Sequence, residues 1–233
     1  MSGVKSRMDN LDIKEIGVRR VNSVLHELPS ESQKHFKILN PMGQHAIACG
    51  LNAPVVIEIN GHVGFYCGGM NQQAKIIING HAGVGVAENM MSGKVQVTGN
   101  ASESAGATAH GGLLVIDGDA SSRCGISMKG IDIVVGGSVG HMSGFMAQSG
   151  HMVICGDAGD ALGDSIYEAT IFVMGKVASL GADCIEKEMK TEHLTKLDEL
   201  IENAGIKADS SSFRRYGSGR TLYNFDLDNA DAY

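Results

Sequence analysis

Short apolar stretches recur along this chain at a fixed interval of 19 residues. In each repeat two aliphatic positions, two residues apart, precede a glycine, as Ile57 and Ile59 precede Gly61. The marker glycines of the seven repeats are Gly61, Gly80, Gly99, Gly118, Gly137, Gly156 and Gly175. Because side chains two residues apart lie on the same face of a strand, each repeat predicts one short β-strand that ends at a turn.

A single repeat of this kind can bury little apolar surface. Stacked repeats would place each inward aliphatic side chain on its equivalent in the next coil and pair the backbone amides between coils. The pattern therefore predicts an all-β fold, a parallel β-helix of about seven 19-residue coils over residues 55–184. Glycine is expected at the corners, where a positive φ or a close approach of two chain segments excludes a side chain.

Patterns with a helical period flank the repeat on both sides. Residues 12–28 begin with Asp12, a good N-cap residue, and place apolar side chains on one face. Residues 186–204 have a leucine-rich face, and the Gly205 that follows them is typical of a helix C-terminus. Short helical extensions are therefore expected at both ends of the β-helix.

The open end of the first coil needs a cover, because a solenoid would otherwise expose its terminal core. Residues 45–51 are apolar enough to supply that cover. The chain is thus expected to have three parts: an N-terminal helix and capping segment in residues 1–54, the β-helix in residues 55–184, and a C-terminal helix with an aromatic tail in residues 185–233.

The C-terminal tail is rich in aromatic residues. It holds five of the 11 in the chain, namely Phe213, Tyr216, Tyr223, Phe225 and Tyr233. Disordered segments are poor in aromatic residues. We therefore expect the tail to be ordered against the β-helix or against another subunit.

Charge and hydropathy exclude several classes of partner. The net charge of −7 argues against nucleic acid as the main partner. No apolar run is long enough to span a membrane, and residues 1–10 are polar and unlike a secretory signal. A cytoplasmic protein is expected.

Candidate metal ligands and nucleophiles are sparse. The five cysteines form no C-x-x-C pair and are expected to be small buried thiols. His62 and His81 follow successive marker glycines and should stack on each other, but two ligands make a poor metal site, so a solvated ladder is the better interpretation. We expect no catalytic, cofactor-binding or metal-binding residue in this chain.

Methionines gather between the marker glycines and the following strands. The set consists of Met90, Met91, Met128, Met142 and Met146. Methionine fills irregular gaps in cores and also suits surfaces that bind partners. Core filling and a docking face therefore both remain open for these side chains.

Three stretches carry a resemblance to a known family. They are GVAENMMSGKVQVTGNASESAGATAHGG, CGDAGDALGDSIYEA and the tail FRRYGSGRTLYNFDLDNADAY. With them the chain resembles the glycine-repeat domain that closes the large subunit of glutamate synthase, a right-handed β-helix. It is more similar still to the stand-alone form of that domain, the B-subunit family of methylamine–glutamate N-methyltransferase, also called N-methylglutamate synthase.

The resemblance implies a structural subunit of a transferase made of several subunits. The complex would convert methylamine and L-glutamate to N-methyl-L-glutamate and ammonia. Its partners would be an amidotransferase-like subunit and a flavin-binding synthase-like subunit, in a higher-order hetero-oligomer. FMN and an iron–sulfur cluster would belong to the synthase-like partner, and the family places no recognised catalytic residue on the β-helix.

Two alternatives stay open. The chain could serve a related glutamate-synthase-like complex, a glutamine-dependent amidotransferase and oxidoreductase. It could also be an enzyme with its own site on the β-helix surface, built from Cys124, His110 and Lys129.

Overall fold

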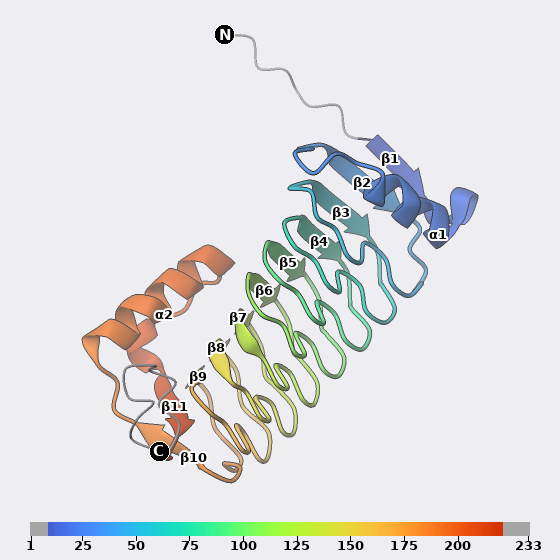
Figure 1. Cartoon of the computed structure of the whole chain (residues 1–233). Coiled ribbons are helices and arrows are strands. Elements are labelled where there is room, and N and C mark those ends of the chain that lie inside the picture. The colour runs from blue at the N-terminus through green and yellow to red at the C-terminus, as the bar shows by residue number, and fades with distance from the viewer. Residues whose placement is uncertain (1–8, 221–233) are drawn as a thin grey trace, which may run out of the picture.

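A computed structural model describes residues 9–220 and shows a parallel β-helix with a helix at each end (Figure 1). The strands form one sheet in the order β1-β2-β3-β4-β5-β6-β7-β8-β9-β11-β10. Those of the repeat are β3 Val56–Asn60, β4 Lys75–Asn79, β5 Lys94–Val97, β6 Leu113–Ile116, β7 Lys129–Val135, β8 Ser149–Ile154 and β9 Thr170–Val173. The fold predicted from the 19-residue interval is confirmed.

Neighbouring coils stack in register. Ile57 pairs with Ile76, and Ile76 with Val95, so each inward aliphatic side chain meets its equivalent one repeat later. A second column of parallel bridges links the small residues that follow the marker glycines, starting with Val63 and Ala82. The inward side chains are fully buried along the whole rod, and they form one continuous core.

The N-terminal end has one more coil than the repeat predicts. Strand β2, His35–Leu39, pairs in parallel with β3, and β1, Asp9–Asp12, pairs with β2. Residues 45–51 lie against the first repeat coil, as the bond from the amide of Gly50 to the carbonyl of Gly69 shows at 2.7 Å. They are thus a coil themselves and need a cover in turn.

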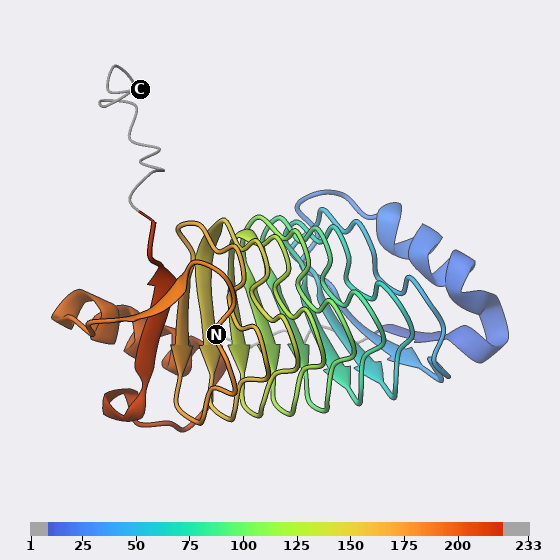
Figure 2. The ribbon, with the colours of Figure 1, turned by 90° about the horizontal axis from the view of Figure 1, so that it is seen from below.

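Helix α1, Ile13–His26, provides that cover and lies across the end of the sheet (Figures 1 and 2). Asn22 donates to the carbonyl of Ala46 at 2.7 Å and accepts from the amide of Ala48 at 2.9 Å. Asp12 is the N-cap, as expected, but Gly17 breaks the helical backbone with a φ of 74°. The capping element is therefore the helix, since its side chains Asn22 and His26 bond the open backbone groups of residues 45–51.

At the C-terminal end the chain folds back into the sheet. Strand β11, Arg214–Ser218, lies antiparallel between β9 and β10, Cys184–Lys187. Helix α2, Thr191–Ala204, therefore starts later than predicted, because the residues before it belong to β10 and the turn that follows. It ends at Gly205, which has a left-handed φ of 74°, as expected.

Helix α2 packs on the outer face of the sheet rather than on its edge (Figure 1). Its apolar face forms a second core with outward side chains of four consecutive strands and with the start of the tail. The buried members of that core are Val115, Val134, Val153, Cys155, Phe172, Leu197, Leu200, Ile201, Ala204 and Phe213. Phe213 and Tyr216 are thus ordered against the β-helix, as predicted, whereas Tyr223, Phe225 and Tyr233 lie outside the described residues.

Candidate functional site

His62 and His81 form the start of a hydrogen-bonded ladder. Their rings stack with centroids 4.8 Å apart and planes 12° from parallel. The Nδ1 atom of His62 accepts the amide of His81 at 2.9 Å, and that of His81 accepts the amide of Asn100 at 2.8 Å. The same bond is made on later coils by the side chains of Asn100, Asp119, Ser138 and Asp157. The ladder interpretation is confirmed, and these side chains satisfy backbone donors of the next coil.

The ladder explains the marker glycines. A Cβ atom built on Gly118 would lie 2.1 Å from Oδ1 of Asn100 and 2.9 Å from the carbonyl oxygen of Gly99. Among the markers only Gly61 has a positive φ, of 132°. At most of these positions the neighbouring coil therefore lies too close for a side chain. The backbone conformation is not the reason for glycine there.

The proposed set Cys124, His110 and Lys129 is not brought together as a reactive site. Cys124 is 0% exposed and lies in the continuous core, and burial raises the pKa of its thiol to about 12. His110 and Lys129 occupy equivalent positions of consecutive coils, and both are exposed. A thiol nucleophile must reach its substrate as a thiolate, and this one is both enclosed and protonated at neutral pH.

The methionines divide between the two interpretations. Met90 and Met128 are fully buried and fill the core, whereas Met91 and Met146 are exposed. Met142 is partly buried. Core filling and surface exposure therefore alternate within one set.

Exposed apolar side chains gather on the loops of the first coils. Fractional exposures are 45% for Phe65, 47% for Tyr66 and 53% for Met70. Tyr66 and Met70 line a shallow depression of about 120 Å³. We call Phe65, Tyr66 and Met70 the apolar loop patch.

The backbone beneath this patch is strained. Tyr66 has a φ of 61° and Met70 a φ of 55°, in the left-handed region that costs a side chain about 1–2 kcal/mol. One coil later the equivalent positions hold Gly85 and Asn89, residue types that tolerate this conformation. Later coils also have a positive φ at these two positions, and some of them place Arg123, Met142 or Met146 there. The conformation therefore belongs to the coil, and the patch is distinguished by its exposed apolar side chains.

A polar cluster lies on the outer sheet face beside α2. The Nδ1 atom of His151 donates to Oδ1 of Asp132 at 2.8 Å, and the ammonium of Lys196 lies 3.4 Å from the same carboxylate. Partial burial, followed by the charge of Arg215, lowers the pKa of His193 on the same helix. The 19-residue spacing of Asp132 and His151 could have predicted this pair, but Lys196 joins it only through the docking of α2.

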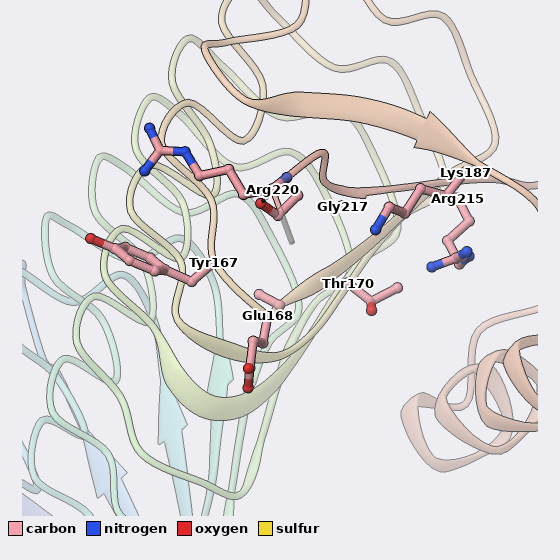
Figure 3. Close-up of a pocket in the computed structure, with 9 residues that line it drawn as sticks. Tyr167, Glu168, Thr170, Lys187, Arg215, Gly217 and Arg220 are labelled. Carbon is pink, nitrogen blue, oxygen red and sulfur yellow. Dashed lines mark hydrogen bonds between the residues drawn. The ribbon is translucent and has the colours of Figure 1, made fainter. Parts of the chain in front are cut away.

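A pocket of about 180 Å³ opens where β11 enters the sheet (Figure 3). Its polar lining includes Thr170 of β9, Lys187 of β10 and Arg215 of β11, with Glu168 and Arg220 at its margin. The Nε atom of Arg215 donates to the carbonyl of Glu188 at 2.8 Å, and Arg220 forms an ion pair with Asp183. Sequence reasoning missed this pocket, because it exists only through the return of the tail between β9 and β10.

Within the described residues 9–220, no three histidine, cysteine, aspartate or glutamate side chains gather closely enough to hold a metal ion. No helix in that part of the chain is both long and apolar enough to cross a membrane.

Comparison with known proteins gives a relative that matches along nearly the whole chain. No protein-family model matches the chain. Protein GlxC of Rhizobium meliloti (strain 1021) is 59% identical over 228 residues, which cover 97% of this chain and all of that protein. Similarity at this level along both sequences shows that the chain belongs to the family of Protein GlxC.

Proposed function

We propose that the chain is a non-catalytic structural subunit of a glutamate-synthase-like complex, located in the cytoplasm. The complex would convert methylamine and L-glutamate to N-methyl-L-glutamate and ammonia, and this chain would hold its catalytic subunits in place. The observation that carries the proposal is the apolar loop patch, three exposed apolar side chains on the loops of a rod of stacked coils.

The composition of the patch supports a protein partner. Aromatic residues and methionine are enriched at the centres of protein interfaces, and methionine adapts to the shape of the surface it meets. Tyr66 is 47% exposed and Met70 is 53% exposed, so apolar surface of both side chains is open to a partner. Burying these apolar side chains against a partner would be favourable, because it removes apolar surface from water.

The rod supports a spacing role. Its strands are joined by backbone hydrogen bonds into one sheet, with a single irregularity between β7 and β8 among the parallel pairs described, and its core is continuous from α1 to β10. Such a body can fix the distance between two bound subunits. The amidotransferase-like and synthase-like partners would hold the active sites, and the synthase-like partner would carry FMN and the iron–sulfur cluster.

Coexpression with the two partner subunits tests the proposal. The full complex should form N-methyl-L-glutamate from methylamine and L-glutamate, whereas this chain alone should be folded and inactive. Turnover by the purified chain would contradict the structural role. A complex that runs only a glutamine-dependent amidotransferase and oxidoreductase reaction would contradict the methylamine assignment.

Paired variants test the patch itself. Tyr66→Asp combined with Met70→Asp should reduce copurification of a partner at least tenfold, because two charges would enter the apolar contact. Met174→Asp is the matched control, since Met174 is 38% exposed and lies outside the patch. Equal losses with both proteins, or no loss with either, would contradict docking at this surface.

A further inference from the structure

The pocket at the junction of β9, β10 and β11 gathers positive charge on a chain whose net charge is −7. Lys187 and Arg215 are direct partners across the β10–β11 ladder, so their side chains leave the sheet side by side. Glu168 is the one carboxylate in the lining, and Figure 3 shows its side chain directed away from Lys187. The interior of the pocket is therefore cationic.

These cations are incompletely neutralised. Among the described residues, the ammonium of Lys187 makes no hydrogen bond or ion pair. Arg215 makes one hydrogen bond, through Nε to the carbonyl of Glu188. Burial lowers the pKa of Arg215, whereas the charges of Glu192 and Glu188 act in the opposite direction without forming an ion pair with it among the described residues. An anion placed between the two side chains would meet donors already held in position.

Two further features define the room beside the cations. Gly217 has no side chain, and a Cβ atom built there would lie 3.6 Å from Cδ of Lys187. The hydroxyl of Thr170 adds a neutral donor to the lining (Figure 3). At about 180 Å³ the cavity is smaller than the roughly 300–1,000 Å³ of pockets for drug-sized ligands, so it suits a small ion rather than a nucleotide.

We infer that this pocket is a binding site for a small oxyanion, a carboxylate or a phosphate group, held between Lys187 and Arg215. The site lies at the opposite end of the rod from the apolar loop patch (Figure 1). A test of anion binding at this site is therefore independent of the docking role proposed above.

Titration of the full chain at low ionic strength tests the site, with inorganic phosphate and succinate as separate probes and acetamide as a neutral control. Calorimetry should show saturable binding of at least one anion and none of acetamide. Binding of phosphate alone would assign the site to a phosphorylated ligand, and binding of succinate alone to a carboxylate. Binding of neither anion would overturn the inference.

Two variants establish where the anion binds. Lys187→Met should weaken binding at least tenfold, whereas Lys75→Met, which removes an exposed lysine from distant β4, should leave it unchanged. Gly217→Val keeps every charge but fills the pocket, and it too should abolish binding once its fold is checked by thermal unfolding. Equal effects of the two lysine variants, or unchanged binding in Gly217→Val, would show a nonspecific charge effect and overturn the site.

Discussion

At the scale of single residues, the periodic glycines serve the side chains of the neighbouring coil. Asn100 reaches across Gly118 to accept the amide of Asp119 at 3.0 Å, and only a residue without Cβ leaves space for it. The sequence predicts that glycine is needed at this interval, but the cause depends on an atom one full coil away. The role of buried Asn71 is equally hidden in the local sequence, because its side chain bonds Ala74 of its own coil and Ser92 of the next.

Replacing a marker glycine tests this account. Gly118→Ala should lower the free energy of unfolding by at least about 2 kcal/mol, because the new methyl displaces Asn100 and leaves a backbone donor unpaired. Gly217→Ala is the matched control, since its Cβ would meet no atom closer than 3.6 Å, and it should change stability by less than about 1 kcal/mol. Urea unfolding followed by circular dichroism measures both. Equal stabilities of the two variants would show that the ladder does not constrain Gly118.

At the scale of elements, the local pattern predicts the strands that recur in every coil. It does not predict elements that depend on a contact made only once in the fold. The inward alternation of each coil identifies the strands, because every one of them is buried in the same way. Strand β10 has no such pattern, with exposed Ile185 and Glu186, and it exists because β11 pairs with it. Its presence delays the start of α2 and creates the anion pocket, so neither could be predicted from local sequence.

The capping role of α1 is testable through its buried face. Val21 is fully buried between the helix and the first coil, so Val21→Asp should detach the helix and expose an unpaired sheet end. Exposed sheet ends pair with other chains, and the variant should form dimers or larger species. Arg19→Asp changes an exposed position of the same helix and should remain at the wild-type size. Light scattering after size exclusion gives the masses, and a Val21→Asp protein of wild-type mass would contradict the capping role.

At the scale of the whole molecule, burial of the cysteines makes the free energy of unfolding depend on pH. Burial raises the pKa of the thiols of Cys155 and Cys184 to about 11 and that of Cys124 to about 12, from an ordinary value of 9.0. An unfolded chain would release these protons near pH 9, whereas the folded chain retains them. Above pH 9 the unfolded state thus binds fewer protons, so stability must fall as the pH rises toward the folded values.

Cys124→Ala isolates one such contribution. Between pH 8 and pH 11 the wild-type free energy of unfolding should fall by about 2–3 kcal/mol more than that of the variant, because each pH unit past the unfolded pKa is worth about 1.4 kcal/mol per thiol. The other cysteines are present in both proteins, and the loss of the buried sulfur is the same at both pH values, so both cancel in this difference. Cys49→Ala is the control, because this thiol is only partly buried and should contribute a smaller difference. Parallel pH profiles for the wild type and Cys124→Ala would mean that water reaches this thiol in the folded chain, and that the core of stacked coils is not closed.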